Sequence, residues 1–160
     1  MRVVLKPDTH RSSESALVLI KPDGMQKGIA GEVVSLFLAD DLRLTGMKLV
    51  QVSSKLAQAH YGHLCEKPFF KEIVSYLMGD LHGGNPVVAM VFTGAGAVAK
   101  CRCIAGATNP EEANPKSVRG KFGRVTTKGV FENLVHVSSD IKESRREIAL
   151  WFKKSELLAP

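Results

Sequence analysis

Three stretches of the chain are continuously apolar and about as long as a strand. They are Ser15–Lys21 (SALVLIK), Pro86–Phe92 (PVVAMVF) and the shorter Asn133–Val137 (NLVHV). Short continuous apolar runs of this kind predict strands that are buried on both faces. A fourth stretch, Leu42–Val52, alternates apolar and polar residues until Gly46 interrupts the pattern, which predicts a strand with a bulge.

Between these strands, apolar residues recur at the three- and four-residue spacing of amphipathic helices. The predicted helices cover Ala30–Asp40, Leu56–Leu64, Lys67–Met78, Ala95–Ile104 and a last helix that follows Asp140. Asp140 and Glu143 have the spacing of an N-terminal capping box, which marks where the last helix starts.

One long segment shows no periodicity. Thr108–Glu132 contains prolines, glycines and many charged residues. This composition predicts a long loop, and a loop of such length in a compact domain usually has a functional role.

The predicted order is β-α-β-α-β-α-β-α, if the helices Leu56–Leu64 and Lys67–Met78, which are split near Pro68, are taken as one helical region. Four strands are too few for a doubly wound sheet with this many helices. The order instead favours an α+β, ferredoxin-like fold, in which two split βαβ units form a four-stranded antiparallel sheet with helices mostly on one face. Residues 15–160 are predicted to form a single domain, and residues 1–14 a flexible lead.

Composition limits the class of protein further. With 44% apolar and 24% charged residues, the 160-residue chain is typical of a globular domain, and no apolar run approaches the length of a membrane span. The first residues lack the apolar core of a signal peptide. Three cysteines without a regular spacing favour a reducing compartment, so we expect a cytoplasmic protein.

The net charge is +6 and the isoelectric point is near 9.3. A basic balance favours polyanionic ligands. Lysines and arginines spread over solvated helix faces would give the same total, so charge does not distinguish a nucleotide from a nucleic acid.

His136 is the most informative candidate for a catalytic residue. It lies at the end of an apolar stretch just before a helix, and that helix carries Glu147. Imidazole is largely neutral at physiological pH and is a competent nucleophile. A carboxylate on the helix could hold one ring nitrogen while the other attacks.

Several other residues suit phosphate groups. Lys21 follows a predicted strand, Thr108 opens the long segment, and guanidinium groups such as those of Arg102 and Arg119 match phosphate oxygens in a bidentate way. Taken one by one, each has an ordinary alternative: a solvated lysine at a strand end, or an arginine in a surface salt bridge. The role of Phe69 also has two alternatives, since its ring could pack in the core or stack on a nucleobase.

His60 and His63 could bridge a metal ion. With no third ligand at a suitable spacing, the sequence predicts no metal site there.

The order of these short motifs resembles the nucleoside diphosphate kinase family. The motifs are KPDG at Lys21, HY at His60, PFF at Pro68, GATNP at Gly106, the Arg119-Gly120 pair, and NLVH together with Glu147. Each is weak alone, but together and in register they span almost the whole predicted domain.

The resemblance implies a function and roles for individual residues. The expected activity is transfer of the γ-phosphate of a nucleoside triphosphate to a nucleoside diphosphate, in a ping-pong reaction through a phosphohistidine. His136 would be the nucleophile, Glu147 would orient it, and Ser138 would support that pair. The expected nucleotide-binding residues are Lys21 with Tyr61 beside it, Arg102, Thr108 and Arg119 at the phosphates, Asn133 at the ribose and Phe69 at the base.

The resemblance also implies Mg²⁺ bound with the nucleotide and a homo-oligomer. The chain departs from the family pattern at Ser139 and Lys121, where aspartates are common, and has extra residues at 79–85 and 123–132. An alternative function is therefore a catalytically weakened relative that binds nucleotide or nucleic acid in a regulatory role.

Overall fold

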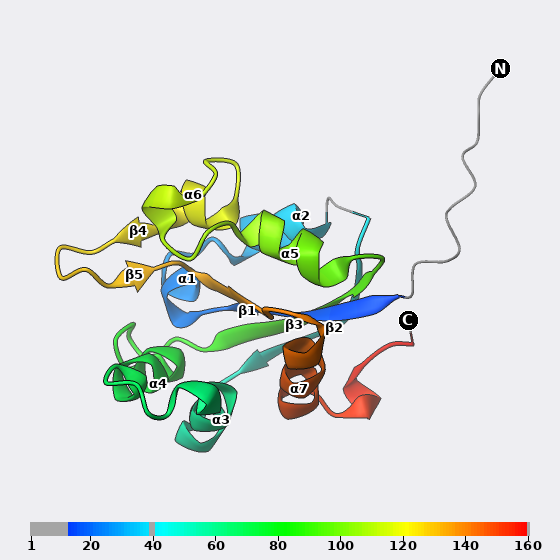
Figure 1. The fold of residues 1–160 in the computed structure, drawn as a ribbon, viewed down its shortest axis with the longest axis horizontal. Helices are drawn as coiled ribbons and strands as arrows, with labels where there is room; N and C mark the ends of the chain where they lie inside the picture. The colour runs from blue at the N-terminus through cyan, green and yellow to red at the C-terminus, as the bar shows by residue number, and fades with distance from the viewer. Residues whose placement is uncertain (1–12, 39–40, 160) are drawn as a thin grey trace.

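A four-stranded antiparallel sheet forms the centre of the protein (Figure 1). The computed structural model describes residues 13–38 and 41–159. In order across the sheet, the strands are β2 (Arg43–Val50), β3 (Val87–Gly94), β1 (Glu14–Ile20) and β6 (Val135–Val137). This order is that of two interleaved split βαβ units, and it confirms the predicted ferredoxin-like fold.

Helices cover both faces of the sheet (Figure 1). One face carries α2 (Ala30–Leu38), α5 (Ala97–Ala105) and α6 (Val118–Phe122), and the other carries α3 (Ser54–His60), α4 (Phe70–Met78) and α7 (Ile141–Trp151). The expectation of helices mostly on one face was wrong.

The physical reason lies in the central strand β1. Val18 and Ile20 belong to the core under α2 and α5, while Leu17 and Leu19 belong to the core under α4 and α7. A strand with apolar side chains on both faces needs a helical layer on each side to exclude water.

The bulge predicted in β2 is present. The pairing of β2 with β3 shifts in register between Leu44 and Gly46. A Cβ added at Gly46 would lie 2.6 Å from a methyl carbon of Leu157, so the glycine lets the C-terminal segment pack against the strand. That segment contains η3 (Lys154–Glu156), and the Leu158 N–H donates to the Thr45 carbonyl at 2.8 Å.

The segment predicted as one long loop contains four short elements instead. They are η2 (Pro110–Glu112), α6, β4 (Arg124–Val125) and β5 (Phe131–Glu132). Side chains of Asn109 and Ser117 cap η2 and α6 by accepting backbone N–H bonds. Elements of two to five residues are too short to show a hydrophobic period, so tertiary contacts and caps decide them.

The remaining boundaries differ by a few residues. Pro22 begins a short helix, α1 (Pro22–Gln26), where a break was expected, because proline suits the first position of a helix. Helix α3 begins at Ser54, since Ser53 caps it, and ends before η1 (Gly62–Leu64). Residues 39–40 lie outside the described residues, as does nearly all of the predicted lead; Glu14, its last residue, begins β1. None of the described helices is long and apolar enough to cross a membrane.

Candidate active site

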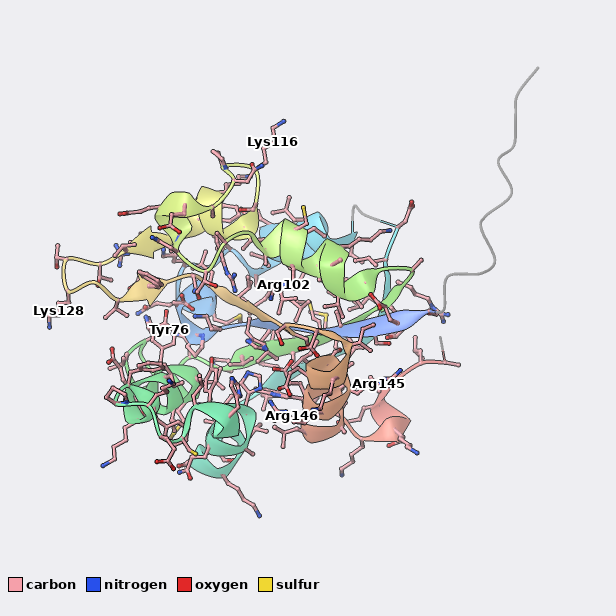
Figure 2. The ribbon with its side chains drawn as sticks, in the orientation of Figure 1. Tyr76, Arg102, Lys116, Lys128, Arg145 and Arg146 are labelled. Carbon is pink, nitrogen blue, oxygen red and sulfur yellow. The ribbon has the colours of Figure 1, made fainter. Side chains whose placement is uncertain are left out.

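A pocket of about 710 Å³ lies beside β6, between α4 and the β4–β5 hairpin. Figure 2 shows two of its residues, Tyr76 from α4 and Arg102 from α5, which come from the two opposite helical layers. The residues predicted from the sequence that line it are Lys21, Tyr61, Phe69, Arg102, Thr108, Arg119, Asn133 and His136. The fold thus brings these residues together from separate parts of the chain, and Ser138 and Glu147 lie directly behind His136.

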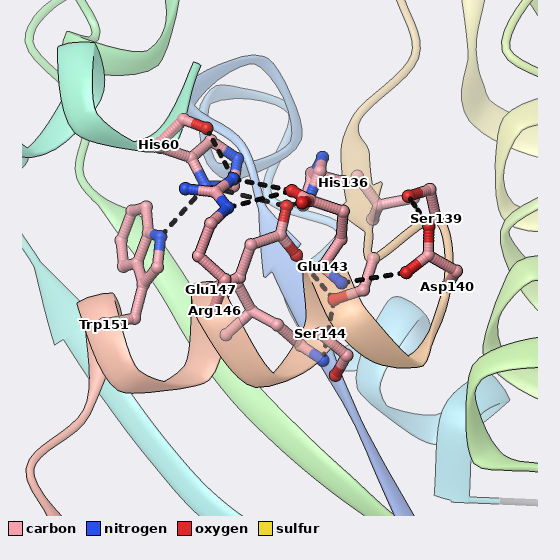
Figure 3. A network of polar contacts seen from close by, with 12 residues as sticks. His60, His136, Ser139, Asp140, Glu143, Ser144, Arg146, Glu147 and Trp151 are labelled. Atoms are coloured by element: carbon pink, nitrogen blue, oxygen red, sulfur yellow. Dashed lines mark hydrogen bonds and ion pairs between the residues drawn. The ribbon is translucent and has the colours of Figure 1, made fainter. Parts of the chain in front are cut away.

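Among the described residues, His136 is held by a carboxylate on one of its two ring nitrogens (Figure 3). Its Nε2 lies 2.9 Å from Glu147 Oε1, while Ser138 Oγ donates to Glu147 Oε2 at 2.5 Å. Burial alone would raise the pKa of Glu147, but the bonds from His136 and Ser138 outweigh it and hold that pKa below its ordinary value. A charged Glu147 keeps the histidine proton on Nε2 and leaves Nδ1 with a free electron pair.

A second histidine packs against the first. His60 is fully buried, and its ring meets that of His136 edge-on, with 4.4 Å between centroids. Trp151 Nε1 donates to His60 Nδ1 at 3.2 Å (Figure 3). Burial and the neighbouring His136 lower the pKa of His60 to about 3, so its ring is neutral at physiological pH. The sequence predicted His60 as part of a family motif and as a possible metal ligand, but it did not predict this packing against His136.

The two histidines and Glu147 also place three potential metal-ligand atoms within 4.8 Å of one another. One ring nitrogen of each histidine already serves another bond, since His60 Nδ1 accepts from Trp151 and His136 Nε2 pairs with Glu147. The arrangement is therefore better suited to orienting His136 than to holding a cation.

Lys21 is buried at the end of β1 and is directed by two neighbours. Its Nζ donates to Asn133 Oδ1 at 2.6 Å and lies 4.4 Å from the ring centroid of Tyr76. Burial, with Arg119 also contributing, lowers the pKa of Lys21 to about 8, although Asp23 opposes the shift. The aromatic ring found beneath this ammonium is that of Tyr76, whereas Tyr61 lines the same pocket. Tyr76 follows Phe69 by two helical turns, so helical spacing could have revealed it.

The arginines differ in how firmly they are held. Arg119 donates from Nη1 to the Gly106 carbonyl at 2.8 Å and from Nη2 to the Val135 carbonyl at 2.9 Å. Burial and the charge of Arg102 lower the pKa of Arg119 to about 10, which leaves it cationic at physiological pH. Arg102 is exposed. The pocket therefore has one fixed guanidinium and one that can adjust to a ligand.

The backbone turns sharply just before His136. Leu134 has a φ of 66°, the left-handed region that side chains other than glycine rarely adopt, and the Val135 N–H donates to the Asn133 carbonyl at 2.7 Å. The buried Asp23 carboxylate accepts the Leu134 N–H at 2.9 Å. Such a conformation costs on the order of 1–3 kcal/mol and persists only where surrounding contacts enforce it. Here it sets the direction in which β6 presents His136 to the pocket.

Known proteins of one family resemble this chain over nearly its whole length. The family model described as "Nucleoside diphosphate kinase" matches residues 14–157. The chain belongs to the nucleoside diphosphate kinase family. The nucleoside diphosphate kinase of Picosynechococcus is 46% identical over 144 residues, covering 90% of this chain and 91% of that protein.

Two solved nucleoside diphosphate kinases have the same fold. The enzyme of Halobacterium salinarum, in complex with CDP, has a TM-score of 0.83 at 35% identity. The match covers 92% of this chain and 93% of the Halobacterium chain. The enzyme of Borrelia burgdorferi, with bound vanadate and ADP, has a TM-score of 0.83 at 28% identity and covers 92% of each chain. Both similarities extend over nearly the entire chain.

The departures from the family pattern fall outside the contacts of His136. Asp140 caps α7 by accepting the Glu143 N–H at 2.8 Å, and the Ser139 hydroxyl donates to the same carboxylate. Lys121 is exposed, with its Nζ 4.9 Å from the ring centroid of Phe122. The extra residues at 79–85 and 123–132 meet each other, because His82 Nε2 lies 3.7 Å from the Glu132 carboxylate.

Proposed function

We propose that this protein carries out the phosphoryl transfer of its family through a phosphohistidine on His136. The observation that carries this proposal is the one-sided restraint of the imidazole: Glu147 occupies Nε2, and Nδ1 is the nitrogen left for the pocket. In the first half-reaction, Nδ1 attacks the γ-phosphorus, the bond to the β-phosphate oxygen breaks, and the nucleoside diphosphate leaves. A second nucleoside diphosphate then takes the phosphoryl group by the reverse path.

The charges around the pocket support this chemistry. Phosphoryl transfer passes through a loose transition state, so the protein mainly positions groups and neutralises charge. Lys21, Arg102 and Arg119 supply cations, and Thr108 supplies a hydroxyl. Among the described residues that line the pocket, Glu72 is the single carboxylate. Mg²⁺ would therefore be held by the phosphates of the nucleotide it arrives with.

The remaining predicted residues suit the nucleoside. Phe69 lines the pocket and is 45% exposed, which leaves a phenyl face on which a base can stack. Asn133 binds both Lys21 and the Thr108 carbonyl, and from that position we assign it the contact with the ribose. Stacking on a phenyl ring is indifferent to base identity, so a broad range of nucleotides is expected.

Brief exposure to γ-labelled ATP tests the nucleophile. The labelled protein should be stable in base, labile in acid, and discharged by added nucleoside diphosphate. His136→Ala should abolish the label, and His63→Ala, which removes an exposed histidine, should retain it. Labelling that survives in His136→Ala would assign the nucleophile to another residue.

We further propose that the protein is a homo-oligomer. Strand β2 lies at the edge of the sheet, and Met47 and Leu49 on it are 52% and 64% exposed. An antiparallel edge strand can pair with the same strand of a second copy around a two-fold axis, which would cover both side chains. The cytoplasmic location remains a proposal based on the cysteine pattern.

A further inference from the structure

Residues 79–85, which are extra relative to the family pattern, form a tightly closed loop after α4. The Gly79 carbonyl accepts two backbone bonds at 2.9 Å, from the His82 N–H and from the Gly84 N–H. The Asn85 side chain donates to the His82 carbonyl at 2.7 Å. Gly79 has a φ of 89°, and a Cβ added there would lie 2.5 Å from the Asn85 carbonyl oxygen, so the closure requires glycine. The loop therefore fixes the position of His82.

His82 packs inward against Tyr76 of α4. The side chain of His82 is buried, and its ring lies 4.6 Å from that of Tyr76 between centroids, at an interplanar angle of 63°. Its Nε2 lies 3.7 Å from the Glu132 carboxylate of β5. Its Nδ1 is also buried and finds no hydrogen-bond partner among the described residues. Hydrogen bonding by itself does not account for this position, whereas packing against the Tyr76 ring does.

Tyr76 in turn supports Lys21. The Lys21 ammonium lies 4.4 Å from the centroid of the Tyr76 ring, and both side chains are buried. Burial and the nearby Asp23 carboxylate raise the pKa of Tyr76, so its hydroxyl keeps its proton and the ring is neutral. A neutral aromatic face attracts an ammonium, and more strongly where water is excluded. The ring therefore favours the charged form of Lys21.

Other charged groups also act on Lys21. Burial is the largest influence on its pKa and lowers it to about 8; Asp23 of α1 and Glu132 of β5 favour the cation, and Arg119 of α6 opposes it. His82 contacts both Tyr76 and Glu132, so it has two routes by which it could influence Lys21. A variant that keeps the ring contact and removes the contact with Glu132 separates these routes.

We propose that His82 is a positioning residue that braces the Tyr76 ring beneath the Lys21 ammonium. The extra segment 79–85 thereby supports phosphate binding from behind, since His82 itself does not line the described pocket. The inference rests on the proposed function in one respect, which is the assignment of Lys21 to the phosphates.

The deciding measurement is the titration of Lys21 in the protein without nucleotide, followed by NMR of carbon-13-labelled lysine. The resonance that Lys21→Arg removes identifies Lys21. In His82→Ala, the apparent pKa of Lys21 should fall by about one pH unit from its value near 8, because the ammonium loses the attraction of the ring. His82→Phe keeps a ring against Tyr76 but cannot pair with Glu132, and it should restore the value near 8.

Variants of the intermediate ring complete the comparison. Tyr76→Leu removes the aromatic face and should reproduce the fall in the pKa of Lys21, whereas Tyr76→Phe retains the face and should not. Leu81→Ala is the matched control in the same loop. It removes a side chain that is 56% exposed, and it should leave the titration unchanged.

Kinetics at two pH values connect the titration to activity. With the pKa of Lys21 one pH unit below 8, the charged fraction at pH 8 falls about fivefold, and kcat/KM for ADP in His82→Ala should fall by the same factor. At pH 6.5 Lys21 is mostly charged in both proteins, so the same variant should differ from the wild type by less than about twofold.

Stability does not decide the question, because His82→Ala removes a buried ring and should lower the unfolding temperature in any case. His82→Val keeps part of the buried volume and should show the same fall in the pKa of Lys21. An unchanged or raised pKa in these variants would overturn the proposal. An equal fall in His82→Phe would overturn it as well, because His82 would then act through Glu132.

The titration requires neither nucleotide nor phosphoryl transfer. A protein that forms no phosphohistidine would refute the proposed function and leave the result for His82 unaffected.

Discussion

At the scale of single residues, neighbours decide which chemistry each side chain can perform. His136 has two ring nitrogens, and the bond between Nε2 and Glu147 leaves Nδ1 without this partner. Glu147 can do this because Ser138 donates to its other oxygen and keeps the carboxylate charged inside the protein. A glutamate buried without these donors would take up a proton more easily and lose its hold on the imidazole.

Lys21 gives the first prediction at this scale. Because the pKa of Lys21 is lowered to about 8, chiefly by burial, the free enzyme loses this cation as pH rises through that value. We expect kcat/KM for ADP to fall above pH 8 with an apparent pKa near 8. Lys21→Arg should remove this fall, since a guanidinium stays charged, even if its activity is lower. A profile that is flat to pH 9.5 in the wild type would contradict the assignment of Lys21 to the phosphates.

The lowered pKa of Lys21 affects stability in the opposite direction from activity. Between about pH 8 and 10.5, the unfolded chain holds a proton on Lys21 that the folded chain has released. The Lys21 contribution to the free energy of unfolding therefore rises with pH over that window. Activity should accordingly fall above pH 8 without any loss of stability that originates from Lys21.

At the scale of elements, short pieces of structure carry the pocket residues and depend on their caps. Helix α6 has only five residues, and yet it places Arg119 against β6. Its N-cap is Ser117, a buried side chain that accepts the Gly120 N–H at 3.2 Å and donates to the Asn114 carbonyl at 2.6 Å.

The second prediction concerns this cap. Ser117→Ala should lower the free energy of unfolding by about 1 kcal/mol, the usual cost of losing an N-cap. It should also raise the KM for ADP several-fold, because Arg119 is displaced with the helix. Chemical denaturation and steady-state kinetics measure the two effects.

Ser53→Ala is the matched control for that change. Ser53 caps α3 in the same way, accepting the Leu56 N–H at 3.2 Å, but the start of α3 does not line the pocket. This variant should lose stability without changing the KM. If both variants affect the KM equally, α6 has no special role in positioning the arginine.

At the scale of the whole molecule, the pocket beside β6 takes its residues from both helical layers. The layer with α5 and α6 provides both arginines, and the layer with α4 and α7 provides Phe69 and Glu147. A site assembled from both layers depends on the complete fold, so partial unfolding of either layer should abolish activity.

The third prediction belongs to the scale of the whole molecule and concerns its assembly. Light scattering should give a mass that is a multiple of 17.4 kDa for the wild type. Met47→Glu combined with Leu49→Glu should reduce the mass, because like charges on a paired edge strand repel each other. Leu81→Glu, an equally exposed site on a loop, should leave the mass unchanged. A wild-type protein that is monomeric at micromolar concentration would refute the proposed oligomer.

The sequence by itself determined the fold class and the four strands of the main sheet. Apolar runs in β1 and β3 and the bulge at Gly46 could be recognised because local pattern decides them. The motif order also pointed to residues that the fold brings to one pocket. Two predictions from the sequence were wrong. Helices cover both faces of the sheet instead of mostly one, and residues 108–132 contain short helices and strands instead of one loop.

Only the tertiary structure decided how these residues act. The tautomer of His136, the neutral state of His60 and the Lys21 pKa near 8 follow from burial and from partners distant in sequence. The ring beneath Lys21 and the hairpin that carries Phe131 likewise depend on contacts between separate segments. Electrostatic and packing energies depend on distance in space, and spacing along the chain does not report that distance.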